Sequence, residues 1–84
     1  MSTITATLRI YVSEDCPGCT RARSIAQAVQ SHRPGVAVEV IDLMDGHPIP
    51  PQVFSVPTYL LNGQVVSLGN PRLDELLASL PAAS

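Results

Sequence analysis

Hydrophobic and polar positions divide the first half of the chain into three segments. Residues 8–12 (Leu-Arg-Ile-Tyr-Val) alternate as a β-strand does. From residue 19 onward apolar residues recur at helical spacing, and Pro34-Gly35 ends that pattern. The apolar positions of this predicted helix are Ala22, Ile25, Ala26 and Val29. Residues 36–41 are rich in β-branched side chains and predict a second strand, so the order indicates a right-handed βαβ unit.

The middle of the chain shows no such period. Gly46, Pro48, Pro50 and Pro51 lie within residues 42–57 and exclude a long helix there. Proline has this effect because it removes a backbone donor and clashes with the preceding helical turn. At most, residues 51–54 are predicted to form a single helical turn.

A hairpin and a helix are predicted for the last third. Asn62-Gly63 separates the predicted strand segments 58–61 and 64–67, and Asn-Gly accepts the positive φ angles of a type I′ turn. Asn70 and Pro71 suit the cap and first position of a final helix. The apolar stripe of this helix is Leu73, Leu76, Leu77 and Leu80, and Pro81 stops it.

These elements predict an α/β fold in the order β-α-β-β-β-α. The sheet is expected to have four strands and to be mixed, with a parallel first pair and an antiparallel hairpin. Both helices are expected to pack on it, because each must bury an apolar stripe.

Composition narrows the function classes. Hydrophobic residues make up 45% of the 84 residues and charged residues 14%, so one folded domain over residues 1–84 is expected. A net charge of −2 without a basic cluster provides no positively charged patch that would bind nucleic acid or an anionic membrane. Neither a signal peptide nor an apolar run of membrane length is visible. We therefore expect no nucleic-acid or membrane partner. Two cysteines that suit a reactive dithiol better than a structural disulfide indicate a reducing, cytoplasmic setting, and a monomer is expected.

The chain's two cysteines form the motif Cys16-Pro17-Gly18-Cys19, next to the predicted helix. This spacing places both sulfurs on the first helical turn, and the positive end of the helix dipole favours a thiolate at Cys16. Such a thiolate attacks another disulfide, and Cys19 then resolves the mixed disulfide by closing the ring. The predicted catalytic residues are Cys16 as nucleophile and Cys19 as resolving thiol, with their disulfide in place of a separate cofactor.

Other uses of the two cysteines are less consistent with the sequence. A structural disulfide stabilises most by closing a long loop, and this pair closes almost none. A zinc site needs four ligands, and the remaining candidates, His32 and His47, fall outside finger-like spacing, so no metal site is predicted. Two thiolates can also hold a soft ion such as Cu(I), which leaves a metal carrier open as an alternative.

Three features carry a family resemblance. Ile10-Tyr11 leads into the cysteine motif, Val56-Pro57-Thr58 precedes the hairpin, and Gly69 follows the last predicted strand. In these features residues 8–80 resemble the thioredoxin-fold superfamily, most closely its small glutaredoxin-like members. The resemblance implies that Pro57 is cis, lies against the cysteine pair and leaves the Val56 backbone free for an extended substrate. The residues implied to contact substrate are Pro17, Gly18, Val56, Pro57 and Thr58. Without the resemblance, Pro57 is an ordinary trans proline at the start of a strand.

Some residues of this chain depart from the glutaredoxin pattern, and these departures bear on whether glutathione is its partner. Glu14 and Asp15 stand where glutaredoxins often carry a basic residue for a glutathione carboxylate, and Gly69-Asn70-Pro71 matches their glutathione-gripping residues poorly. Near the motif, Arg23 and the helix dipole favour the Cys16 thiolate, while the two acidic residues oppose it. Thr20 and Arg21 are expected on a solvated helix face, and Tyr11 and Tyr59 in strand packing.

The sequence thus predicts a thiol–disulfide oxidoreductase that reduces protein disulfides by mixed-disulfide exchange. A reductase or glutathione would return its electrons. The alternatives are a glutathione-dependent glutaredoxin and a non-enzymatic binding module or soft-metal carrier.

Overall fold

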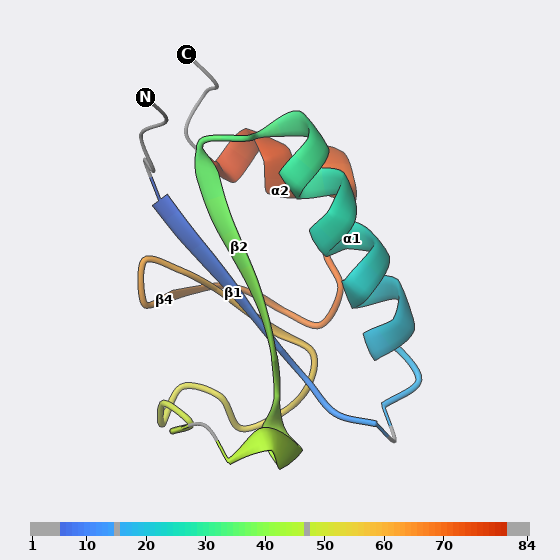
Figure 1. The fold of residues 1–84 in the computed structure, drawn as a ribbon, viewed down its shortest axis with the longest axis vertical. Helices are drawn as coiled ribbons and strands as arrows, with labels where there is room; N and C mark the ends of the chain where they lie inside the picture. Colours follow the sequence, from blue (N-terminus) through green and yellow to red (C-terminus); the bar gives the residue numbers. More distant parts are fainter. Residues whose placement is uncertain (1–5, 15, 47, 81–84) are drawn as a thin grey trace.

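The computed structural model describes residues 6–14, 16–46 and 48–80. Its elements follow the predicted order β-α-β-β-β-α, the order of a minimal thioredoxin fold (Figure 1). The elements are β1 (Ala6–Val12), α1 (Cys19–His32), β2 (Val36–Asp42), the 3-10 helix η1 (Leu43–Asp45), β3 (Thr58–Leu61), β4 (Gln64–Leu68) and α2 (Leu73–Ser79).

The four strands form one mixed sheet in the order β2-β1-β3-β4. β1 and β2 run parallel, from the pair Ala6 and Val36 to the pair Val12 and Asp42. β3 runs antiparallel to both β1 and β4. The predicted parallel pair and hairpin are therefore confirmed.

The hairpin turn has the backbone that Asn-Gly favours. Asn62 has a φ of 51° and Gly63 a φ of 83°, both in the left-handed region of a type I′ turn. Asn62 also ties the turn to the central strand. Its Oδ1 accepts a hydrogen bond from the Thr7 amide at 3.0 Å, and its own amide donates to the Thr7 carbonyl at 2.9 Å.

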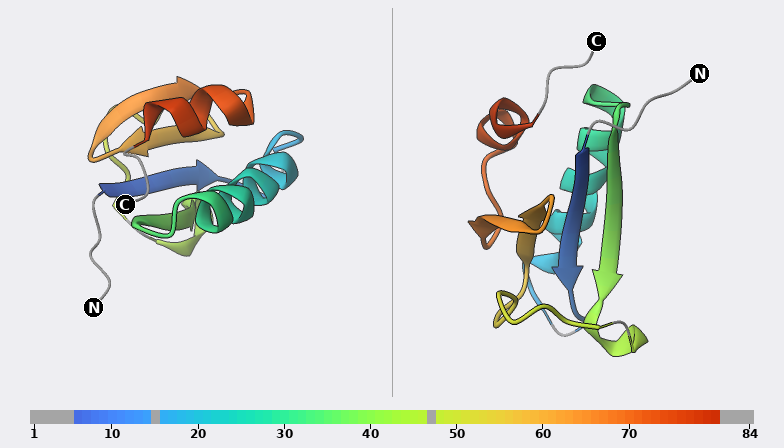
Figure 2. Two further views of the ribbon diagram at one scale, coloured as in Figure 1. Left: turned by 90° about the horizontal axis from the view of Figure 1, so that it is seen from above. Right: turned by 90° about the vertical axis from the view of Figure 1, so that its left-hand side faces the viewer.

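Both helices cover the same face of the sheet, as the two turned views show (Figure 2). α1 buries the four apolar positions that the sequence predicts, and α2 buries Leu76 and the following Leu80, while Leu73 and Leu77 are partly buried against the same core. These side chains meet Leu8, Ile10 and Tyr59 from the two central strands. The amphipathic stripes thus fix where the helices lie. Within the described ranges, neither helix is long and apolar enough to cross a membrane.

The opposite face carries a smaller apolar cluster. Tyr11, Val53 and Leu60 are its buried members, and Ile41 and Leu43 pack against them. Val53 comes from the connection between β2 and β3, which the sequence predicts to hold a helical turn at residues 51–54. The predicted limit of one turn holds there, and the helical piece of this connection is η1, where the Asp42 carboxylate accepts from the Met44 amide at 2.9 Å. Residues 50–53 form only a hydrogen-bonded turn, because prolines supply no amide hydrogen at positions 50 and 51.

Both helices begin later than the sequence indicates. Gly18 is the N-cap of α1, so Cys16 and Pro17 lie in the turn before the helix. Arg72 is the N-cap of α2, and no side chain caps it. Asn70, the predicted cap, makes other hydrogen bonds that are described below. Pro81, the predicted stop signal, lies outside the described residues.

Candidate active site

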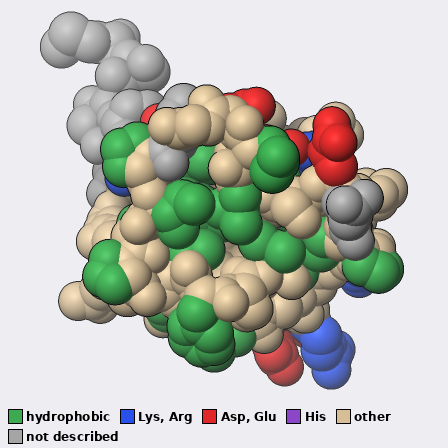
Figure 3. Space-filling view, turned by 90° about the horizontal axis from the view of Figure 1, so that it is seen from below, with side chains coloured by type: hydrophobic (Ala, Val, Ile, Leu, Met, Phe, Trp, Pro, Cys, Tyr) green, Lys and Arg blue, Asp and Glu red, His purple; other side chains and the backbone are tan. Residues whose placement is uncertain are grey.

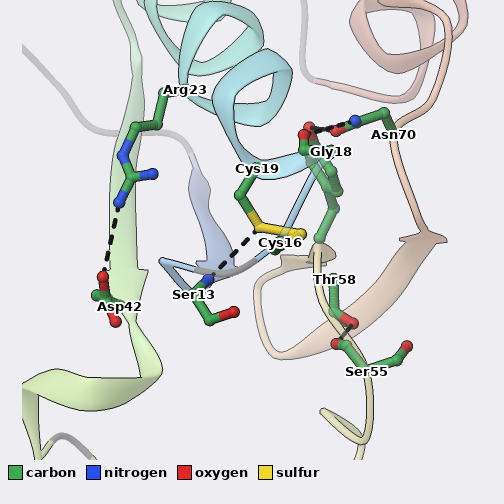
Figure 4. Close-up of a disulfide and its surroundings, with 10 residues drawn as sticks. Ser13, Cys16, Gly18, Cys19, Arg23, Asp42, Ser55, Thr58 and Asn70 are labelled. Atoms are coloured by element: carbon green, nitrogen blue, oxygen red, sulfur yellow. Dashed lines mark hydrogen bonds and ion pairs between the residues drawn. A yellow bond between two sulfur atoms is a disulfide. The ribbon is translucent and has the colours of Figure 1, made fainter.

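The two cysteines lie where the loop after β1 enters α1, and their sulfurs form a disulfide (Figure 4). Their Cα atoms are 5.3 Å apart, and the Cys19 amide donates to the Cys16 carbonyl at 3.1 Å. Cys19 is only 1% exposed and belongs to the main core, whereas Cys16 is half-buried. An attacking thiol therefore reaches the pair from the Cys16 side.

The buried sulfur has a partner in the loop. The Ser13 amide lies 3.4 Å from Cys19 Sγ and donates to it. A backbone N–H aimed at a sulfur stabilises negative charge on it. The sequence did not indicate this contact, since a backbone donor leaves no trace in residue type.

Pro57 lies against the motif loop. The Val56–Pro57 peptide bond is cis, and a Cβ added to Gly18 would lie 3.6 Å from Pro57 Cδ. The Gly69 amide donates to the Pro57 carbonyl at 2.8 Å, which extends the β3–β4 pairing by one bond. Val56 is half-buried, and no described residue hydrogen-bonds to its main chain.

Thr58 has a different position from the one that the resemblance implies. Its side chain is completely buried, and its hydroxyl donates to the Ser55 carbonyl. A buried side chain cannot touch a docked substrate. Thr58 therefore holds the shape of the segment that leads into Pro57.

Asn70 bridges the hairpin side of the sheet to the motif. Its Nδ2 donates to the Gly18 carbonyl at 2.8 Å, and its Oδ1 accepts from the Tyr59 hydroxyl at 2.8 Å. Tyr59 is completely buried, and that burial raises the pKa of its hydroxyl to about 12, although the charge of Arg21 acts to lower it. The raised pKa extends the range in which the hydroxyl is protonated and able to donate from neutral into alkaline pH. Sequence reasoning missed both contacts, because it assigned Asn70 to capping and Tyr59 to packing alone.

Comparison with known proteins agrees with this arrangement. The family described as a thioredoxin domain matches residues 6–80. The chain belongs to this thioredoxin family. A relative named thioredoxin, from Methanocaldococcus jannaschii, is 29% identical to this chain; the match covers 87% of this chain and 89% of the relative. The family, the fold and the cysteine pair together support a redox protein of the thiol–disulfide oxidoreductase type.

The charges around this thioredoxin-family motif differ from the sequence expectation. The Arg23 guanidinium lies 3.7 Å from an Asp42 carboxylate oxygen on β2, so its charge is directed there and not toward Cys16 (Figure 4). Glu14 is exposed to solvent, which screens its effect on the sulfurs. Asp15 lies outside the described residues.

The remaining candidates have ordinary positions in this thioredoxin-family chain. Thr20, Arg21 and His32 are exposed on α1, and Tyr11 is buried in the sheet. His47 lies outside the described residues. Among residues 6–14, 16–46 and 48–80, no three His, Cys, Asp or Glu side chains gather as metal ligands.

The surface seen from below is mostly uncharged and carries several hydrophobic side chains (Figure 3). The connection between β2 and β3 lies at this end (Figure 1) and exposes three large apolar side chains. These are Met44, Ile49 and Phe54, which is 76% exposed. Phe54 lies two residues before Val56, so an apolar side chain lies in the same segment as the Val56 main chain, to which no described residue hydrogen-bonds.

Proposed function

We propose that this protein is a thiol–disulfide oxidoreductase that reduces disulfides in other proteins. One observation carries the proposal: a half-buried Cys16 forms a disulfide with a buried Cys19 in the loop that enters α1. Unequal burial supports the proposed roles, since the more exposed sulfur is the one open to an incoming partner. Cys16 is the nucleophile, and Cys19 is the resolving thiol.

The reaction has two exchange steps that balance in atoms and electrons. In the first, the Cys16 thiolate attacks one sulfur of the substrate disulfide, and the other substrate sulfur leaves as a thiolate that takes up a proton. In the second, the Cys19 thiolate attacks Cys16 Sγ, which releases the remaining substrate thiol. Two electrons pass to the substrate, and the protein leaves as the Cys16–Cys19 disulfide.

A polypeptide substrate fits the surroundings of Cys16. The unpaired main chain of Val56 suits an extended strand, whose backbone would add donors and acceptors there. Exposed Pro17 and half-buried Gly18 adjoin Cys16 in the chain, and exposed Phe54 offers apolar contact. Pro57 is buried, so its part is to shape the segment that presents the Val56 main chain.

A glutathione mixed disulfide fits less well. Exposed Glu14 would repel a glutathione carboxylate, and the Asn70 side chain is already bonded to Gly18 and Tyr59. We therefore place protein disulfides before glutathione mixed disulfides as the substrate class. An external dithiol, from a reductase or from the glutathione pool, returns the two electrons. The protein acts as a cytoplasmic monomer and needs no cofactor besides its own cysteines.

An insulin-reduction assay with dithiothreitol as donor tests the proposal. We expect wild-type protein to accelerate insulin reduction, Cys16→Ser to fall to the uncatalysed rate, and Cys19→Ser to lose multiple turnover. Ser31→Ala, on the exposed side of α1, is the control and should match wild type. Wild-type activity in Cys16→Ser would refute the assignment. Efficient turnover of a glutathionylated peptide, with none on insulin, would instead favour a glutaredoxin. Tight stoichiometric Cu(I) binding without any exchange would favour a metal carrier.

A further inference from the structure

Gly18 has a backbone that any residue adopts. Its φ of −83° and ψ of −7° are right-handed helical values, so conformational freedom does not require glycine here. The lack of space requires glycine instead, because a Cβ at this position would lie 3.0 Å from Asn70 Nδ2 and 3.6 Å from Pro57 Cδ. The motif glycine therefore allows close approach of the Asn70 amide.

The orientation of that amide is fixed from both sides. The Gly18 carbonyl can only accept, so Nδ2 must face it, at 2.8 Å. Oδ1 then faces the Tyr59 hydroxyl, which donates to it at 2.8 Å. Because Tyr59 is completely buried in the sheet, this chain of two bonds connects the motif to the hydrophobic core.

The backbone beside Asn70 is tied to Pro57. Gly69 has a φ of +90°, which turns the chain away from β4, and its amide donates to the Pro57 carbonyl at 2.8 Å. One short segment, Gly69-Asn70, thus contacts Pro57 through its backbone and Gly18 through its side chain. The motif loop, Pro57 and the end of β4 are held as a unit.

We propose that Asn70 is a positioning residue that sets the equilibrium between the dithiol and the disulfide of Cys16 and Cys19. Gly18 lies inside the ring that the disulfide closes, so a hydrogen bond to its carbonyl restrains the loop with the two cysteines close together. The folded protein therefore already holds the loop in part of the order that ring closure requires. This raises the effective concentration of one sulfur near the other and so favours the disulfide. The inference rests on the proposed function in that the pair must cycle between the two states.

The test is the redox equilibrium of the purified protein in dithiothreitol buffers, which needs no substrate. We expect Asn70→Ala to lower the equilibrium constant for closing the Cys16–Cys19 ring about three- to tenfold. This makes the reduction potential of the pair about 15 to 30 mV less negative. The matched control is Asn62→Ala, which removes another asparagine bonded to backbone, far along the hairpin. It should lose stability and keep the wild-type potential. An unchanged potential in Asn70→Ala would overturn the proposal.

Gly18→Ala provides a second route that keeps Asn70 in place. The Cβ that Gly18→Ala adds must displace the Asn70 side-chain amide. When Asn70 is present, we therefore expect the same fall in the ring-closure equilibrium constant. In the Asn70→Ala background the obstacle is gone, and Gly18→Ala should change the equilibrium constant less than about twofold. Additive effects of the two substitutions would contradict the proposal. Loss of insulin reduction with these shifts intact would refute the proposed function alone.

Discussion

At the scale of single residues, Tyr59 is a packing residue with a second role. It is fully buried, yet its hydroxyl is hydrogen-bonded to Asn70 Oδ1. Burial disfavours the phenolate and raises the pKa of Tyr59 to about 12. The ordinary value in an unfolded chain is about 10, so Tyr59 ionises more easily after unfolding.

This difference predicts an alkaline loss of stability. The contribution of Tyr59 is fully present below about pH 10 and is lost as the pH rises toward about 12, because the folded state holds the proton longer. Linkage sets the loss at about 2 kcal/mol. Urea unfolding at about pH 9 and about pH 11.5 measures it, with Tyr59→Phe as the comparison. We expect the fall in unfolding free energy to be smaller in Tyr59→Phe, and an equal fall in both proteins would contradict this account.

Residue type and spacing were enough to predict that the sulfurs of Cys16 and Cys19 lie within bonding reach, because this depends only on two cysteines three positions apart. The same reasoning failed for Arg23, which sequence distance placed near Cys16 and the structure pairs with Asp42 on β2. It also missed Asn70, which is 52 residues from Gly18 along the chain. Such contacts depend on tertiary structure, and one sequence does not encode them in local pattern.

At the scale of elements, the hairpin was predictable because its signal is local. Asn62 and Gly63 adopt positive φ, and adjacent residues alone determine that turn. The start of α2 was not predictable in the same way. Asn70 has the residue type of a cap, but its side chain bonds to Gly18 and Tyr59, so the helix begins at Leu73.

The Asn62-Gly63 turn gives a prediction about the stability of the protein and none about its activity. Gly63 has a φ of 83°, and nothing lies within 4 Å of an added Cβ. Gly63→Ala should therefore lower the unfolding free energy by about 1–2 kcal/mol, through backbone conformation alone. Chemical denaturation measures this, and Gln64→Ala at the neighbouring exposed position is the control. A stability equal to that of the control would contradict it.

The central strand gives a prediction about packing. Leu8 is completely buried on the face of the sheet that the helices cover. Leu8→Ala should lower the unfolding free energy by about 2–5 kcal/mol, since it removes buried methyl groups and leaves a cavity. Leu68→Ala, at a leucine that is 55% exposed on β4, should change it by less than about 0.5 kcal/mol. Similar losses at both leucines would show that this core assignment is wrong.

At the scale of the whole molecule, the connection between β2 and β3, which exposes Met44, Ile49 and Phe54, lies at the same end as the loop before α1 (Figure 1). If this end receives a polypeptide, Phe54→Ser should lower kcat/KM for insulin about fivefold, the effect of roughly 1 kcal/mol of lost contact. It should leave reduction of a small aromatic disulfide unchanged. Val65→Ser, which alters a 40% exposed valine on the hairpin, is the control for insulin reduction. Equal losses on the small disulfide and on insulin would argue against a polypeptide contact at Phe54.

The most direct measurement traps the mixed disulfide. Reduced Cys19→Ser protein is mixed with a protein that carries one disulfide, and the product is mapped by mass spectrometry after digestion without reductant. The account predicts one covalent adduct per chain, joined through Cys16, and none with wild-type protein, in which Cys19 resolves it. Cys16→Ser protein should form little adduct, because Cys19 is buried. Efficient trapping through Cys19 in Cys16→Ser, or no adduct in Cys19→Ser, would contradict the central claim that Cys16 is the attacking thiol.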